Sequence, residues 1–200
     1  MIVLGLTGSV GMGKSTVARM LKTARIPVFD ADAYVHRALR RGGRGVRDVA
    51  HAFPAAYDGS RDAIDRTKLG ALVFNNPPAR KKLEAILHPL VRNAELRFIR
   101  RHQAWRTRLI VLDIPLMFET RADVLCHAVI CVTAPKFIQQ ARVMARPGMT
   151  ADKFARILAA QMPDAEKRLR ADYILQTGHG RHQTWRDLQT ILTALKTKHA

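Results

Sequence analysis

Eight consecutive residues near the N-terminus have the types and the spacing of a phosphate-binding loop. The stretch Gly8-Ser9-Val10-Gly11-Met12-Gly13-Lys14-Ser15 fits the pattern G-x-x-x-x-G-K-[ST]. Its glycines allow close backbone approaches that a Cβ would block, so that successive N–H groups can surround an anion. Lys14 can reach the β- and γ-phosphates of a nucleotide, and the Ser15 hydroxyl can ligate Mg²⁺. We therefore expect residues 8–16, which include Thr16, to bind nucleotide phosphates.

Two carboxylates follow the apolar run 27–29, at a position where α/β proteins bind ligands. Asp30 and Asp32 are two residues apart, so in extended geometry their side chains share a side. The carboxyl ends of parallel strands, beside a phosphate loop, form the ligand-binding edge of such a sheet. Asp32 can accept the proton of an attacking hydroxyl there, and we expect it to be catalytic. Asp30 fits a catalytic role and a helix N-cap about equally well.

A third aspartate follows the apolar run 109–112. Asp113 can hold Mg²⁺ through a water molecule. The next residue is Ile114, where ATP-driven motors usually have a glutamate, and this disfavours a motor. The base-reading signature Asn-Lys-x-Asp of GTPases does not occur in the sequence, which favours ATP as the nucleotide.

Two arginines after the fourth apolar run could bind the transferring phosphoryl group. Arg142 and Arg146 are four residues apart and share one face of a predicted helix. Their charge could stabilise the transition state of phosphoryl transfer. The alternative is a solvated basic face, which is common in a chain this basic. We favour the catalytic role for Arg142 and nucleotide binding for both.

The elements that position these residues follow from hydrophobic patterning. Five short apolar runs predict parallel strands at residues 2–7, 27–29, 109–112, 128–132 and 173–175. Helical patterns separate the runs, with no convincing strand between residues 33 and 108. The clearest helix there covers residues 79–106 and is expected to divide at Pro89. Further helices are predicted at 135–146, 151–170 and 184–196, so we expect an α/β fold with a helical insert and a second, smaller excursion.

The chain carries a net charge of +18, from 34 lysines and arginines against 16 acidic residues. This charge predicts anionic ligands, either phosphorylated metabolites, nucleotides or nucleic acid. The segment 40–45, Arg-Arg-Gly-Gly-Arg-Gly, has the composition of RNA-binding segments but lacks interleaved aromatic residues. We interpret it as a basic loop between two helices. Weak nucleic-acid binding at about 10⁻⁴–10⁻⁶ M is expected of any protein this basic, and we expect no specific nucleic-acid partner.

Composition also argues against several other classes of protein. No run approaches the 18 or so apolar residues of a membrane span, so we expect no membrane partner. The first apolar stretch is short and lacks the basic region of a signal peptide. Cys126 and Cys131 are expected to be thiols rather than disulfide or metal ligands, which fits a reducing cytoplasm. We expect a cytoplasmic monomer.

The motifs along the chain resemble, in order, those of the dephospho-coenzyme A kinase family, and the resemblance runs nearly end to end. It is carried by residues 5–18, by Val28-Phe29-Asp30-Ala31-Asp32, Leu87-His88-Pro89-Leu90, Asp113-Ile114-Pro115-Leu116-Met117-Phe118-Glu119 and Arg142-Val143-Met144-Ala145-Arg146, by Gln161 and by Ala171-Asp172-Tyr173. The phosphate loop is generic. The combination of the two-aspartate, Leu-His-Pro and Asp-x-Pro-Leu-x-Phe-Glu segments is much more specific.

The resemblance implies a P-loop NTPase fold in three parts. These are a nucleotide-binding core of residues 1–32, 109–135 and 171–200, a helical acceptor domain of residues 33–108, and a lid of residues 136–170. It implies transfer of the γ-phosphoryl group of MgATP to the ribose 3′-hydroxyl of dephospho-CoA, the last step of CoA synthesis. Asp32 would be the catalytic base, assisted by Lys14 and Arg142.

The same resemblance implies that His88 and Pro115 lie beside the acceptor. Considered without the family, His88-Pro89 is more typical of a helix junction than of a ligand contact. Two other functions remain as alternatives: another P-loop metabolite or nucleoside-monophosphate kinase, and a nucleic-acid-dependent P-loop ATPase.

The chain departs from the family pattern at two places that bear on the site. Pro147-Gly148 follows the second lid arginine, where the family usually has Asp or Asn, and this should end the lid helix early. Gln176-Thr177-Gly178 replaces an Asn-rich turn. Backbone contacts to adenine can persist there, whereas the side-chain contacts of the family turn cannot be assumed.

Overall fold

The computed structural model describes residues 1–74 and 76–198, and the chain folds into two compact units. Unit 1 consists of Met1–Phe29 and the described residues from His102 onward, and it contains the phosphate loop. Unit 2 is Asp30–Arg101. Each unit has its own buried apolar cluster, as expected for segments that form separate cores.

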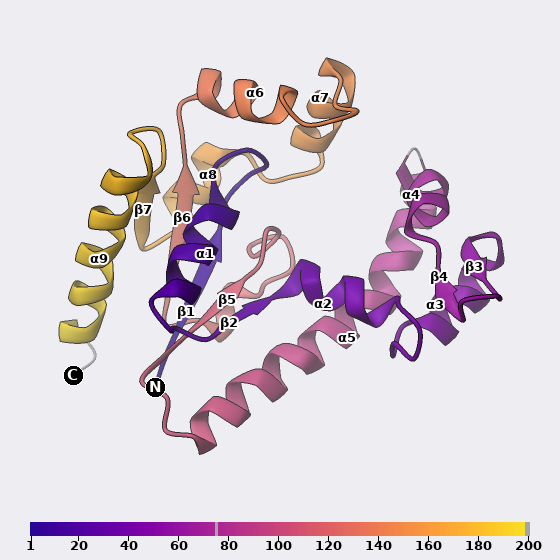
Figure 1. Cartoon of the computed structure of the whole chain (residues 1–200), viewed down its shortest axis with the longest axis horizontal. Helices are drawn as coiled ribbons and strands as arrows, with labels where there is room; N and C mark the ends of the chain where they lie inside the picture. The colour runs from indigo at the N-terminus through magenta and orange to yellow at the C-terminus, as the bar shows by residue number, and fades with distance from the viewer. Residues whose placement is uncertain (75, 199–200) are drawn as a thin grey trace. The chain divides into compact units, whose positions relative to one another are not determined.

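Unit 1 is built on a five-stranded sheet with the strand order β2-β5-β1-β6-β7 (Figure 1). The strands are β1 (Ile2–Thr7), β2 (Val28–Asp30), β5 (Leu109–Asp113), β6 (Ala128–Thr133) and β7 (Tyr173–Gln176). Central β1 pairs in parallel with β5 on one side and β6 on the other, with Leu4 opposite both Val111 and Ala128. All five predicted strands and the expected P-loop fold are confirmed.

The helices that lie wholly in unit 1 are α1 (Lys14–Thr23), α6 (Lys136–Met144), α7 (Ala151–Ala159), α8 (Asp164–Arg170) and α9 (Arg181–Lys198). Helix α1 packs against β1, α8 against β6 and α9 against β7, whereas α6 and α7 contact one another. Leu4 and Leu6 of β1 are fully buried in a cluster that also holds Leu21 of α1 and Leu188 of α9. Gly5 lies between Leu4 and Leu6, and since Cβ directions alternate along a strand, a Cβ at Gly5 would face the opposite side of the sheet. A Cβ there would lie 2.6 Å from Met117 Sδ, so the segment after β5 packs directly on the strand.

Unit 2 is mainly helical. Its elements are α2 (Ala31–Ala38), α3 (Val46–Ala52), a 3₁₀ turn (Pro54–Ala56), β3 (Tyr57–Asp58), β4 (Ala63–Ile64), α4 (Arg66–Phe74) and α5 (Pro77–Ala104). The expectation of no strand in this region is wrong, since β3 and β4 pair antiparallel. Strands of two residues are too short for a hydrophobic period to appear in the sequence. The Arg-Gly segment is the loop between α2 and α3, as interpreted.

Two helix boundaries near prolines differ from the predicted ones. Pro89 does not divide its helix, because α5 runs without interruption from Pro77 to Ala104. Pro89 and Ala85 are both exposed, so water can satisfy the carbonyl group that loses its helical donor. The predicted helix 151–170 is in fact two helices. Pro163, which lacks an N–H and disfavours helical geometry in the residue before it, stands at the start of α8.

Helix α6 ends early, as the Pro147-Gly148 departure predicts. Helix α6 stops at Met144, before Arg146, and Gly148 adopts a positive φ of 68° in the turn that leads to α7. Helix α9 has the predicted place and is longer at both ends. Over the described residues, no helix combines the length and apolar character needed to cross a bilayer.

Candidate active site

The phosphate loop joins β1 to α1 and has the strained backbone that its glycines predict. Gly11 and Gly13 have φ values of 78° and 91°, which residues with a Cβ rarely adopt. Space is limiting as well, because a Cβ on Gly13 would lie 2.8 Å from Thr177 Oγ1, and one on Gly11 would lie 2.5 Å from Val143 Cγ2. The loop therefore packs directly on helix α6 and on the turn after β7, and a larger residue at either glycine would have to displace these neighbours.

The start of α1 presents backbone donors to an anion. Gly13 is the N-cap of α1, and Lys14 and Ser15 are its first residues. Within the described chain, the N–H groups of these three residues donate to no protein acceptor. The partial positive charge of the helix N-terminus adds to them. This combination of free amides and helix dipole is the arrangement that binds phosphate.

Lys14 is ion-paired to the last residue of β5. Its Nζ lies 2.6 Å from Asp113 Oδ1, and both side chains are largely buried. The pairing follows from the sheet, because Asp113 stands opposite Leu6, next to the start of the loop. The two residues that the sequence assigns to phosphate and Mg²⁺ are therefore brought together by adjacent strands. Ser15, the other proposed Mg²⁺ ligand, is exposed at the start of α1.

Two glutamine side chains hold the middle of the loop through hydrogen bonds to the backbone of one residue, Val10. Gln139 of α6 donates from Nε2 to the carbonyl oxygen of Val10 over 2.8 Å. Val10 N–H in turn donates to Gln161 Oε1 over 3.1 Å. Sequence reasoning missed Gln139 and noted Gln161 only as part of the family pattern. The spacing of Gln139 and Arg142, three residues apart on one helix face, is a signal that could have indicated a shared target.

Arg142 is held by hydrogen bonds to the turn that follows β7. Its guanidinium donates to Thr177 Oγ1 over 2.9 Å and to the Thr177 carbonyl oxygen over 2.8 Å. Thr177 Oγ1 also donates to the carbonyl oxygen of Met12, 2.7 Å away. Thr177, which departs from the family pattern, thus joins Arg142 to the phosphate loop. Arg146 is exposed one turn further along the chain.

A buried lysine fixes the segment that follows β5. Lys167 of α8 is fully buried, and its Nζ lies 2.9 Å from Glu119 Oε1. It also donates to the Pro115 carbonyl oxygen over 2.9 Å, and Thr7 Oγ1 donates to the same oxygen over 3.1 Å. A buried ammonium group needs such partners. Pro115 is therefore held with its carbonyl group occupied by protein donors, which leaves its ring as the part available to a substrate.

Asp30 and Asp32 are distinguished by their places at the start of α2. Asp30 is the N-cap, and its Oδ1 accepts a 2.9 Å hydrogen bond from Ala33 N–H. Asp32 lies within the first helical turn and is exposed. The cap, one of the two roles expected for Asp30, is therefore observed. Because Asp30 already satisfies the helix start, the fold does not require a carboxylate at Asp32. His88 is exposed on the continuous helix α5, so the helix-junction interpretation is wrong.

The two cysteines and the possible metal-ligating side chains were the other candidates for chemistry in the described residues. Burial raises the pKa of the Cys131 thiol to about 12, so the thiol is not a nucleophile at neutral pH. Both cysteines are free thiols, as expected. Over residues 1–74 and 76–198, no three His, Cys, Asp or Glu side chains are grouped closely enough to hold a metal ion by themselves.

Comparisons with known proteins agree with this geometry. The family model described as dephospho-CoA kinase matches residues 2–182. The dephospho-CoA kinase of Paramagnetospirillum magneticum is 57% identical over 169 residues, which cover 84% of this chain and 78% of that protein. That of Rhodospirillum rubrum is 47% identical over 98% of this chain and 92% of its own.

A crystal structure of a Thermus thermophilus protein is also similar, with a TM-score of 0.83, 36% sequence identity and coverage of 96% of both chains. The phosphate loop, its lysine and the strand-end aspartate thus belong to a chain that matches one kinase family over nearly its whole length. The chain is a member of the dephospho-CoA kinase family.

Proposed function

We propose that this chain transfers the γ-phosphoryl group of MgATP to the ribose 3′-hydroxyl of dephospho-CoA, with Lys14, Asp32 and Arg142 as its catalytic residues. The observation that carries the proposal is the family match over residues 2–182, which contain all three. The division of labour follows the parts expected from the sequence. Residues 1–32, 109–135 and 171–200 bind the nucleotide, residues 33–108 bind the acceptor, and residues 136–170 form the lid.

The phosphate loop holds the donor. The amides of Gly13, Lys14 and Ser15 face no protein acceptor in the described chain and are available to phosphate oxygens. Gly8, Ser9, Gly11 and Thr16 complete the loop around them. Negative charge spreads over the transferring group in the transition state, so a fixed cation beside it lowers the barrier. Lys14 is such a cation, held at its aliphatic end by α1 and at its ammonium group by Asp113.

Magnesium fits the oxygen donors present. Mg²⁺ prefers hard oxygen ligands and binds through one or two protein groups together with substrate phosphates and water. The Ser15 hydroxyl would bind it directly and Asp113 through a water molecule. When bound, the ion neutralises charge on the β- and γ-phosphates.

Asp32 serves as the base for the acceptor. Its carboxylate hydrogen-bonds the 3′-hydroxyl, orients it toward the γ-phosphorus and takes its proton as the new P–O bond forms and ADP leaves. The cap at Asp30 supports this role, since the start of α2 is already satisfied without Asp32. His88 and Pro115 contribute to acceptor binding.

Arg142 and Arg146 bind the phosphates from the lid. Arg142 is already oriented by its bonds to Thr177, so little side-chain entropy is lost when it meets the nucleotide. Arg146 is exposed and lies four residues further along the chain, just after the end of α6, where it can join when the lid closes. A basic chain suits this reaction because both substrates carry several phosphates. We expect a cytoplasmic monomer with no specific nucleic-acid partner.

A single assay separates this proposal from its alternatives. ADP release is measured with dephospho-CoA, with AMP and CMP, and with duplex DNA and RNA, and the dephospho-CoA product is compared chromatographically with authentic CoA. The proposal predicts turnover with dephospho-CoA alone and a product identical to CoA. Turnover that depends on a nucleoside monophosphate or on nucleic acid, with none on dephospho-CoA, contradicts it. Lys14→Ala is the control for contaminating kinases and should be inactive.

A further inference from the structure

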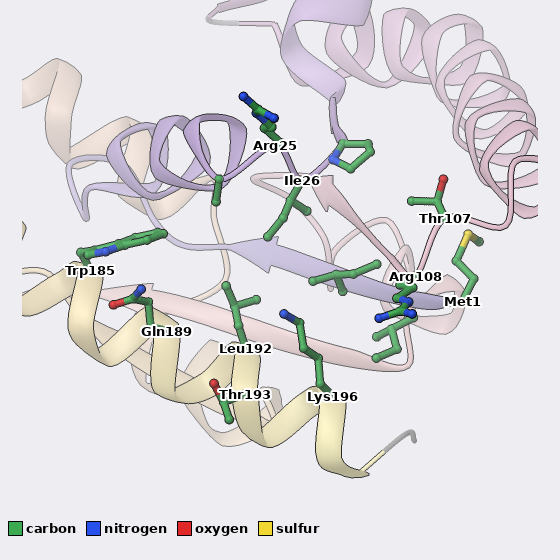
Figure 2. A pocket seen from close by; sticks show the side chains of 14 residues that line it. Met1, Arg25, Ile26, Thr107, Arg108, Trp185, Gln189, Leu192, Thr193 and Lys196 are labelled. Atoms are coloured by element: carbon green, nitrogen blue, oxygen red, sulfur yellow. The ribbon is translucent and has the colours of Figure 1, made fainter.

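Unit 1 contains a concave site far from the phosphate loop. A pocket of about 830 Å³ opens at the amino-terminal ends of the central strands (Figure 2). Ile2 begins β1 and Leu109 begins β5, and both line it. The phosphate loop follows Thr7 at the other end of β1, so the length of a six-residue strand, about 20 Å, separates the two sites. Nothing in the proposed reaction uses this pocket.

The inner surface of the pocket is apolar. Ile2, Leu109 and Leu192 are buried residues that line it. Figure 2 shows Ile26, from the connection between α1 and β2, and Leu192 of α9 facing one another across it. The indole ring of Trp185 closes one end. An apolar cavity with an aromatic wall favours the burial of hydrocarbon, because such burial removes apolar surface from water.

The polar part of the lining is cationic. Arg25, Arg108 and Lys196 line the pocket, and none of its described lining residues is acidic. Figure 2 shows Lys196 extending from α9 toward the strands, with Arg108 at the strand ends. In the described part of the chain, neither Lys196 nor Arg108 takes part in an ion pair. Like charges around one cavity repel each other, and an anion placed between them relieves that repulsion.

We propose that this pocket binds an amphipathic anion, a molecule with an apolar body and one terminal carboxylate or phosphate group. The body would lie on Ile2, Leu109 and Leu192 against Trp185, and the anionic group would lie between Lys196 and Arg108. The apolar surface selects for the body of the ligand, and the two cationic side chains select for its anionic group. A purely apolar molecule leaves the cations uncompensated, and a bare anion gains nothing from the hydrocarbon floor.

The chain has a built-in reporter for this binding. Of its two tryptophans, Trp185 lines the pocket and Trp105 is 65% exposed elsewhere. In a Trp105→Phe background, the fluorescence therefore comes from Trp185 alone. Decanoate and decyl phosphate are titrated below their micellar concentrations, so that the two possible anionic groups are compared on one apolar body. Decyltrimethylammonium supplies the same body with the opposite charge, and inorganic phosphate supplies the charge without the body.

The proposal predicts saturable changes in Trp185 fluorescence with decanoate, with decyl phosphate or with both, and binding at least about fivefold weaker for decyltrimethylammonium and for inorganic phosphate. Lys196→Gln and Arg108→Gln should each weaken binding of the anion about threefold or more. Lys198→Gln, which makes the same change on the same helix outside the lining, should leave it unchanged. MgATP should not displace the ligand, which separates this site from the nucleotide site.

Three results would overturn the proposal. One is equal binding of the cationic amphiphile, which would indicate hydrophobic adsorption. Another is an equal loss in Lys198→Gln, which would indicate general attraction to a basic protein. The third is the absence of saturation in a protein whose circular dichroism and melting temperature match those of the parent. Each result is independent of dephospho-CoA phosphorylation, which is measured separately on the same samples.

Discussion

Gln139 donates a 2.8 Å hydrogen bond to the carbonyl oxygen of Val10, in the middle of the phosphate loop. The backbone N–H group of Val10 donates in turn to Gln161 Oε1, so α6 and the connection between α7 and α8 hold Val10 by both its backbone groups. A loop that must present several N–H groups to phosphate gains from such restraint, because the ordering cost is met before the nucleotide arrives. The two glutamines are therefore expected to set the affinity of the loop for ATP.

One substitution made at both glutamines tests this role. Gln161→Glu keeps an oxygen acceptor for Val10 N–H, whereas Gln139→Glu replaces a donor with a carboxylate that faces a carbonyl oxygen. An unsatisfied buried group costs about 1–3 kcal/mol, so Gln139→Glu should raise the KM for ATP by about 5- to 150-fold. Gln161→Glu should change it by less than about threefold. Both variants add the same charge near the phosphates, so equal effects in steady-state kinetics would assign the loss to charge and contradict the positioning role.

The hydroxyl group of Thr177 should stabilise the nucleotide site. It accepts from Arg142 and donates to the carbonyl oxygen of Met12. Thr177→Val keeps the shape and removes both bonds, so the free energy of unfolding in urea should fall by about 1–3 kcal/mol. Thr177→Ser retains the hydroxyl and should lose less than half of that amount. A Val variant as stable as the parent would show that the hydroxyl carries no net stabilisation.

Asp113 should govern the requirement for Mg²⁺. Removing its charge in Asp113→Asn frees Lys14 and weakens the water-mediated hold on the ion. A hydrogen bond to a charged group is worth about 1.5–3 kcal/mol, so half-maximal activity should need about 10- to 150-fold more Mg²⁺. Asp123→Asn, the same change in the 3₁₀ turn Asp123–Leu125, is the control and should leave the Mg²⁺ titration unchanged. An unaltered Mg²⁺ dependence in Asp113→Asn would remove Asp113 from the metal site.

The sequence predicts the phosphate loop and its strands better than it predicts the residues that hold them in place. The strands and the phosphate loop are local signals, because an apolar run and a glycine pattern carry their own structural meaning. Gln139 and Lys167 act on partners more than 50 residues away, Val10 and Pro115, and no local period indicates such contacts. At Pro89 a local signal misleads instead. Proline inside a helical pattern predicts a break in the helix, but the packing and exposure of α5 permit a continuous helix.

The buried thiol of Cys131 should be protected by the fold. Its pKa is raised to about 12 from an ordinary value of 9.0, chiefly by burial, so only about 10⁻⁴ of it is thiolate at pH 8. Iodoacetamide at pH 8 should leave Cys131 unmodified in the native protein and alkylate it in urea, as read by peptide mass spectrometry. Because the folded chain keeps this proton to higher pH than the unfolded chain, stability should fall as the pH rises from about 9 toward 12. Rapid alkylation of Cys131 without urea would contradict its burial.

The proposed role of Asp32 is to take the proton of the acceptor hydroxyl. Two matched variants measure the contribution of this role to kcat most directly. Asp32→Asn and Asp30→Asn each remove one negative charge at the start of α2. Asparagine is a good N-cap, so Asp30→Asn should keep kcat within about threefold of the parent. Asp32→Asn should lower kcat for dephospho-CoA by at least about 10², the contribution typical of a general base, while the Kd for ATP changes by less than about twofold. A kcat for Asp32→Asn equal to that of Asp30→Asn would contradict the account and remove Asp32 from the mechanism.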